Sequence, residues 1–251
     1  MSRTPPQESK SITWIVDDLR HHGASYPLLW ATAGTARALA GRLVSEHGDH
    51  RREVVRNPHR NAAWAREAAC SLLDVVQAVI GPDVAIENTF LVTKWPSTSF
   101  EVPWHQDGTD RRIELDPARS VSAWLAITDA ATSNGCLHIA PGSHRLGYLP
   151  YELDDADANG AQRGRAGRAA GFCCRDAVPV PIAAGHAVLM DVRLLHRSGL
   201  NTSRSTRIGL NIRYVAPGAA RTRDHTTPDL APISGTAWQP AVHDEQEHRR
   251  S

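Results

Sequence analysis

The chain contains 251 residues, 41% of them apolar, and its 28 basic residues nearly balance its 27 acidic ones, leaving a net charge of +1. This length and composition predict one soluble globular domain with a sizeable core. The balanced charge provides no basic surface of the kind that binds nucleic acid or an anionic membrane, so we expect a small-molecule partner and neither of those.

The N-terminal residues MSRTPPQESKSITW lack the apolar stretch of a signal peptide, and no window approaches 18 uninterrupted apolar residues. We therefore expect a cytoplasmic protein. The four cysteines show neither a CxxC spacing nor the density of a disulfide scaffold, which favours free thiols. The sequence is compatible with a monomer or a homodimer.

Two amphipathic helices are predicted first, because apolar residues recur every three to four positions in Thr35–His47 and Asn61–Ile80. Short runs rich in β-branched residues follow, separated by Gly, Pro, Asn and Ser clusters. They predict strands at Ile86–Lys94, Ser120–Thr128, Cys136–Ala140, Val178–Ile182, Ala187–Asp191 and Arg207–Val215. Helices followed by many strands indicate an α+β protein that is mainly β.

Residues 1–251 are predicted to form a single catalytic domain, since no internal repeat or linker divides them. Residues 154–171 contain four glycines and almost no apolar side chains, so we expect a mobile lid loop. Residues 1–10 and about 218–251 are polar, and we expect them to be extended or partly disordered.

The chemistry centres on the segment Pro103-Trp-His-Gln-Asp-Gly108, in which His105 and Asp107 are two positions apart. On an extended strand this spacing places both side chains on one face, roughly 6–7 Å apart at the backbone. An imidazole and a carboxylate supply two ligands of a 2-His-1-carboxylate metal site, which leaves coordination positions open.

An HxD pair is a weak signal by itself, because 13 histidines and 27 acidic residues will produce one by chance. His47-Gly48-Asp49 has the same spacing, and His243-Asp244-Glu245 offers an HxE pair. The first follows a charged helix end and the second lies in the polar tail, so we interpret both as solvent-exposed pairs.

A third ligand and an anion-binding residue follow at a suitable distance. Residues 185–196 form an apolar segment that ends on His196, and Arg207 begins another predicted strand eleven residues later. A turn through residues 201–205 would fold that strand back antiparallel and bring Arg207 to the metal. The planar guanidinium suits a dicarboxylate because it can donate two parallel hydrogen bonds.

From about Asn88 to Pro217 the sequence resembles the phytanoyl-CoA dioxygenase superfamily. Four segments carry the resemblance: KWPSTSFEVPWHQDG, SVSAWLAITDA, SNGCLHIAPGSHR and VLMDVRLLHRSGLNTSRSTRIGLNIRYV. They contain the HxD pair, the NGxL and PGSH signatures, a distal histidine and an arginine about eleven residues beyond it.

The resemblance implies a double-stranded β-helix (jelly roll, cupin-like) with N-terminal helices packed on the major sheet. It implies Fe(II) bound by His105, Asp107 and His196, with 2-oxoglutarate and O₂ as co-substrates. Arg207 and Ser198 are expected to bind the distal carboxylate of 2-oxoglutarate. The further expected co-substrate contacts are Asn88, Thr93 and Lys94.

The resemblance also implies a hydroxylase or related oxidase. Halogenases of this group replace the metal-binding carboxylate with a small residue, whereas Asp107 is present here. The short chain favours a small polar metabolite or natural-product intermediate as the substrate, with succinate and CO₂ released. Two alternatives stay open: a cupin-like isomerase or lyase that does not use 2-oxoglutarate, and a non-catalytic jelly-roll binding module.

Overall fold

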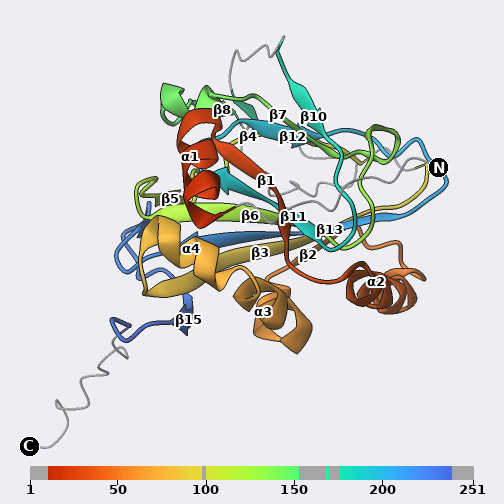
Figure 1. The fold of residues 1–251 in the computed structure, drawn as a ribbon, viewed down its shortest axis with the longest axis horizontal. Helices are drawn as coiled ribbons and strands as arrows, with labels where there is room; N and C mark the ends of the chain where they lie inside the picture. The colour runs from red at the N-terminus through yellow and green to blue at the C-terminus, as the bar shows by residue number, and fades with distance from the viewer. Residues whose placement is uncertain (1–10, 98–99, 153–167, 170–175, 239–251) are drawn as a thin grey trace, which may run out of the picture.

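The computed structural model describes residues 11–97, 100–152, 168–169 and 176–238. Two antiparallel β-sheets lie against each other, and the helices gather on the outer face of the larger sheet (Figure 1). This is the jelly roll that the family resemblance implied. The α-helices are α1 (Ile12–His22), α2 (Ala33–His47), α3 (Ala63–Cys70) and α4 (Leu73–Ile80).

The larger sheet has the strand order β1-β11-β6-β13-β3-β15, and β2 also pairs with β3. Its strands are β1 (Ala24–Leu29), β2 (Val54–Arg56), β3 (Val84–Lys94), β6 (Ser120–Ala126), β11 (His186–Asp191), β13 (Arg207–Val215) and β15 (Ala231–Ser234). The smaller sheet has the order β10-β7-β12-β4, formed by β10 (Val178–Val180), β7 (Leu137–Ile139), β12 (His196–Ser198) and β4 (Val102–His105). Two short ribbons complete the strands: β5 (Ile113–Leu115) with β14 (Ala220–Thr222), and β8 (Tyr151–Glu152) with β9 (Arg168–Ala169).

Alternation along the strands of the larger sheet divides the interior into two layers, because successive side chains point to opposite faces. On β13, Ile208, Leu210 and Ile212 belong to the apolar cluster that contains the buried residues of the helices. On β6, Trp124 and Ala126 face the opposite way and pack with side chains of the smaller sheet. The polar residues of β13 are therefore directed between the two sheets.

Helix α1 was not predicted from the sequence, although its end signals are present. The Ser11 side chain accepts a hydrogen bond from the backbone of Trp14, and Gly23 ends the helix in a left-handed conformation. Ile15 and Leu19, four positions apart, are its buried residues. The predicted helix Asn61–Ile80 is wrong as one element, because it divides into α3 and α4.

The division follows from Ser71, whose hydroxyl donates to the carbonyl of Ala68. Such a side-chain bond competes with the hydrogen bonds that continue a helix.

The segment from 185 to 196 also differs from the prediction of one strand ending on His196. Strand β11 ends at Asp191, a turn follows, and His196 begins β12 in the other sheet. The sequence analysis proposed that the strand beginning at Arg207 folds back antiparallel on this segment, but β13 does not pair with it. Strand β13 lies in the larger sheet between β6 and β3.

The chain beyond residue 218 forms two short strands that the sequence did not predict. Strand β15 pairs with the end of β3 that β2 leaves uncovered, so it protects an open sheet edge. The predicted lid loop, residues 154–171, lies outside the described residues except for β9. Residues 1–10 and 239–251 also lie outside them.

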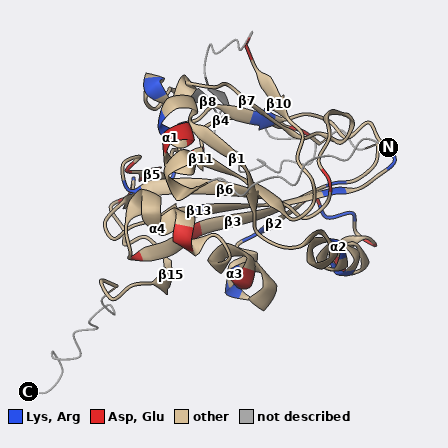
Figure 2. Ribbon diagram, in the orientation of Figure 1, with Lys and Arg blue, Asp and Glu red and all other residues tan. Residues whose placement is uncertain are grey.

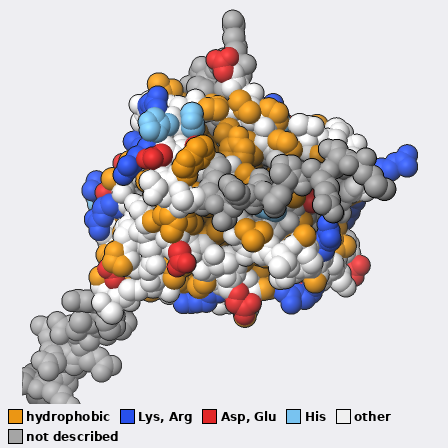
Figure 3. Space-filling view, viewed as in Figure 1, with side chains coloured by type: hydrophobic (Ala, Val, Ile, Leu, Met, Phe, Trp, Pro, Cys, Tyr) orange, Lys and Arg blue, Asp and Glu red, His pale blue; other side chains and the backbone are white. Residues whose placement is uncertain are grey.

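Acidic and basic residues are scattered over the described elements and form no continuous basic surface on the face shown (Figures 2 and 3). Among the described residues, no helix combines the length and the apolar character needed to cross a bilayer.

Candidate metal and co-substrate site

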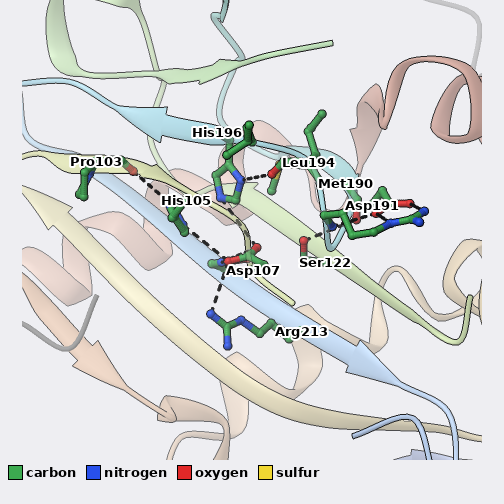
Figure 4. Close-up of polar contacts among 12 residues, drawn as sticks. Pro103, His105, Asp107, Ser122, Met190, Asp191, Leu194, His196 and Arg213 are labelled. Atoms are coloured by element: carbon green, nitrogen blue, oxygen red, sulfur yellow. Dashed lines mark hydrogen bonds and ion pairs between the residues drawn. The ribbon is translucent and has the colours of Figure 1, made fainter. Parts of the chain in front are cut away.

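Three side chains with metal-binding groups converge between the sheets (Figure 4). His105 ends β4 and His196 begins β12, and these two residues face each other in the pairing of the two strands. The Nε2 atoms of His105 and His196 lie 3.7 and 3.8 Å from the carboxylate oxygens of Asp107. One ligand atom from each residue lies within 4.8 Å of the others, which fits a single metal ion.

Backbone carbonyl groups fix the orientation of both imidazole rings. The Nδ1 atom of His105 lies 2.8 Å from the carbonyl oxygen of Pro103, and Nδ1 of His196 lies 3.0 Å from that of Leu194. A ring that donates from Nδ1 leaves the lone pair of Nε2 for a metal. The two histidines therefore have the tautomer and direction that metal binding requires.

Asp107 is fully buried and receives hydrogen bonds from the opposite sheet. The amide nitrogen of Asn211 lies 3.1 Å from each carboxylate oxygen, and Nη2 of Arg213 lies 3.6 Å from Oδ1. Burial alone would raise the pKa of Asp107, but His196, His105 and Arg213 together hold that pKa well below its usual range. Asp107 is therefore anionic, which suits a metal ligand.

Arg213 connects Asp107 to two further acids. Its Nη1 atom lies 3.6 Å from Glu87 and 3.8 Å from Asp110. Burial raises the pKa of Glu87 and Arg213 opposes this rise. A buried cation shared by several carboxylates keeps its charge compensated without binding one of them exclusively.

The other two residues of the HQDG segment support the ligands. Gln106 is buried, donates to the carbonyls of Gly147 and Arg193, and accepts from the backbone of Leu149. A Cβ atom at Gly108 would overlap the hydroxyl of Tyr148. These contacts fix the backbone on either side of Asp107.

Arg207 lines the same cavity as the three ligands and is 1% exposed. Its Nε and Nη2 atoms both donate to the carbonyl of Gly135, and its guanidinium lies over the ring of Trp124, 5.1 Å from the ring centroid. Burial lowers the pKa of Arg207 to about 10. Since an arginine has five N–H groups, the guanidinium retains donors for a carboxylate.

Three glycine and serine positions of the signature segments have visible roles. Gly135 of the NGxL segment has a φ of 81° and supplies the carbonyl that binds Arg207. A Cβ atom at Gly209 would overlap Trp124, so glycine lets that ring lie flat on β13. Ser143 of the PGSH segment accepts from the backbone of Leu195 and so positions the residue before His196.

Of the residues expected to contact 2-oxoglutarate, some line the cavity and others do not. Ser198 is buried and lines the cavity. Lys94 does not reach it: its ammonium donates to the carbonyls of Phe100, Ser198 and Gly199, so it joins the end of β3 to the chain after β12. Thr93 lies one position away, on the face where Leu91 packs against the helices, and does not line the cavity.

Asn88 lines the cavity but lies far from Arg207 along the sheet. It pairs with Arg213, whereas Arg207 pairs with Lys94. Six residues of extended strand span about 20 Å. The structure therefore places Asn88 on the side of the metal ligands remote from Arg207.

The chance HxD pair at residue 47 is on the surface, where His47 lies 3.9 Å from Glu46 and Asp49 is exposed. The HxE pair at residues 243–245 lies outside the described residues. Within the described residues, His105, Asp107 and His196 are the cluster with metal-binding geometry.

The sequence analysis missed Asn211, Arg213 and Glu87. Asn211 and Arg213 follow Arg207 at even spacings on a strand whose other residues are mainly apolar. On a strand, this spacing puts all three on one face. The period-two pattern of polar residues was therefore the available signal.

The cavity has a volume of about 1020 Å³. His105, Asp107, His196 and Arg207 line it together with residues of the segments 52–57, 110–113 and 222–230. This volume is large enough for a co-substrate and a second small molecule together.

Comparison with known proteins agrees with this geometry. The family model "Phytanoyl-CoA dioxygenase (PhyH)" matches residues 28–209. The chain is 31% identical over 139 residues to phytanoyl-CoA dioxygenase domain-containing protein 1 of Danio rerio, a match that covers 55% of this chain and 45% of that protein. It is 29% identical over 132 residues to phytanoyl-CoA dioxygenase 1 of Oryza sativa subsp. japonica, covering 52% and 44%. The matches thus span about half the length of these curated relatives.

Solved structures share the fold. The apo non-heme monooxygenase ThoJ superposes with a TM-score of 0.69 at 23% identity, covering 88% of this chain and 84% of its own. AviO1 from Streptomyces viridochromogenes Tue57 gives 0.60 at 26%, covering 85% and 98%. The epimerase SnoN, solved with Fe³⁺, alpha ketoglutarate and nogalamycin RO, gives 0.67 at 18%, covering 89% and 96%.

Proposed function

Because this chain belongs to the phytanoyl-CoA dioxygenase family, we propose that it is an Fe(II)- and 2-oxoglutarate-dependent dioxygenase that hydroxylates a small polar molecule. One observation carries the proposal. A 2-His-1-carboxylate cluster with correctly oriented imidazoles shares a cavity with a fully buried arginine whose guanidinium retains N–H donors.

His105, Asp107 and His196 would hold the iron. With three protein ligands on one side, the other coordination positions are open to small molecules. Iron held by these residues would supply O₂ activation: two electrons would come from the decarboxylation of 2-oxoglutarate to succinate and CO₂ and two from the substrate, with one oxygen atom entering each product.

Arg207 orients the co-substrate through its distal carboxylate. Its attachment to Gly135 and its contact with Trp124 fix the guanidinium before a ligand arrives, so little side-chain freedom is lost on binding. Ser198, which is buried and lines the same cavity, shares this role. Burial excludes water from the ion pair and strengthens it.

Asn211 holds the carboxylate of Asp107 in place during the reaction. Burial opposes its ionisation, but His196, His105 and Arg213 hold the pKa of Asp107 well below its usual range, so it stays ionised. The cavity-lining residues near Arg213, including Glu87 and Asn88, would hold the substrate.

Anaerobic titration of the apo-protein with Fe(II) and 2-oxoglutarate tests the proposal. A weak visible charge-transfer band is expected in the wild type, lost in His196→Ala and weakened in Arg207→Ala, with Thr93→Val as the unaffected control. If correctly folded wild-type protein shows no band, the 2-oxoglutarate assignment is wrong and a metal-dependent isomerase or lyase becomes the better assignment.

A further inference from the structure

A β-bulge in β3 brings two consecutive polar side chains into the cavity. The pairing of β3 with β13 is regular from Lys94 to Asn88, where Arg213 faces Asn88, but Tyr214 then faces Ile86. Glu87 is thus an extra residue in β3. Bulges of this kind redirect side chains and recur beside active sites, and both Glu87 and Asn88 line the cavity.

Four buried polar atoms around this bulge have no hydrogen-bond partner in the protein. They are Oε2 of Glu87, Oδ1 of Asn88, Oδ1 of Asn211 and Nε of Arg213. The direction of Asn211 is fixed, because the carboxylate of Asp107 accepts only from the amide nitrogen and the amide oxygen must point elsewhere. Oε2 of Glu87 lies 3.6 Å from Nη1 of Arg213, an ion pair that leaves it without a hydrogen bond, and the other three atoms likewise have no hydrogen bond within the protein.

The bulge residues Glu87 and Asn88 lie at the end of the β3–β13 pairing remote from Arg207. Arg207 and Arg213 are six residues apart on β13, which corresponds to about 20 Å of strand. A five-carbon diacid that extends from Arg207 to the metal is much shorter than this span. Asn211 lies between the two arginines and contacts Asp107, so the bulge is on the far side of the metal ligands.

We propose that the bulge forms a substrate subsite for a molecule that carries several hydroxyl groups. The inference rests on the proposed function, which it deepens by naming the class of substrate. Hydroxyl groups donate to the three oxygens and can accept from Arg213. An alkyl chain would leave these buried groups unpaired, and sites built for hydrogen bonding reject ligands that lack the matching groups.

Ligand-observed NMR tests the subsite with two probes of the same ring size. Methyl α-D-glucopyranoside carries hydroxyl groups and methoxycyclohexane carries none. Each is added to full-length protein loaded with Ni(II) and 2-oxoglutarate, and 2-oxoglutarate binding is recorded in the same samples. We expect the glucoside to bind more tightly than methoxycyclohexane.

Variants locate the binding. Asn88→Leu keeps the side-chain size but removes the acceptor, and should weaken glucoside binding about 5- to 10-fold. Glu87→Gln retains an acceptor oxygen and should retain binding, whereas an ammonium-binding site would lose its charge partner. Thr93→Val, one face away on β3, is the matched control.

Equal binding of the two probes, unchanged glucoside binding in Asn88→Leu, or no glucoside binding in protein that binds 2-oxoglutarate would overturn the subsite. If the glucoside binds in an Asn88-dependent way but 2-oxoglutarate does not bind, the subsite stands and the proposed function fails.

Discussion

Replacing Asn211 by leucine tests how the larger sheet supports a metal bound mainly by the smaller one. The amide nitrogen of Asn211 lies 3.1 Å from both oxygens of Asp107, and leucine of similar size donates to neither. Loss of a donor makes the carboxylate more basic, which by itself favours metal binding. Weaker metal binding by the variant would therefore show that the Asp107 carboxylate has lost its orientation.

Groups that orient metal ligands typically contribute about 10- to 100-fold to metal affinity, which corresponds to about 1.4–2.8 kcal/mol. We expect a loss in this range for Asn211→Leu when the apo-protein is titrated anaerobically with Co(II) and its visible bands are followed. Thr93→Val should keep wild-type affinity. An unchanged Co(II) affinity in folded Asn211→Leu would refute a positioning role for Asn211.

Three other predictions follow from the structure. Arg207→Lys should weaken 2-oxoglutarate binding by at least about tenfold, measured by calorimetry on Ni(II)-loaded protein, because an ammonium cannot replace the planar fork; Ni(II) affinity without 2-oxoglutarate should not change. Gly209→Ala should displace Trp124, lower the free energy of unfolding by about 1–3 kcal/mol in urea titrations, and weaken 2-oxoglutarate binding as well; a wild-type midpoint would contradict the tight packing. His59 is buried, with Nδ1 2.8 Å from Oγ1 of Thr89, and burial lowers its pKa from 6.5 to about 4. Between these pH values the unfolded chain binds more protons than the folded one, so the free energy of unfolding should fall as the pH decreases from about 6.5 to 4. His59→Gln should reduce this fall by on the order of 2 kcal/mol, and an unchanged pH dependence would show that His59 does not titrate in this way.

The cluster of His105, Asp107 and His196 could be predicted from sequence because its chemistry is local. His105 and Asp107 share one face of a short extended segment, and His196 follows an apolar run that predicts a buried position. The runs of β-branched residues similarly predicted β3, β6, β11 and β13 of the larger sheet, and helical periodicity predicted α2. Ser71 shows where such patterns fail, since one hydroxyl bond divides a helix that remains amphipathic on both sides.

The residues around the metal depended on pairing between distant strands. Lys94 and Thr93 were expected beside the co-substrate, but neighbouring residues of a strand cannot share a face, and neither side chain lines the cavity. The adjacent polar residues Glu87 and Asn88 interrupt the alternation of β3 but do not by themselves identify a bulge. It is visible only when β3 is aligned with β13.

Strand β13 also limits how the proposed site can change. Residues at every second position of β13 face the cavity and contribute to the site, namely Arg207, Gly209, Asn211 and Arg213. Inserting or deleting one residue between them would turn every later side chain from the cavity toward the helices. Individual side chains of β13 can be changed by substitution. The spacing between the proposed co-substrate, metal and substrate positions is fixed by the strand and cannot be adjusted gradually. New specificities should therefore arise where loop residues line the cavity, such as 110–112 and 226–230, because loops tolerate changes in length.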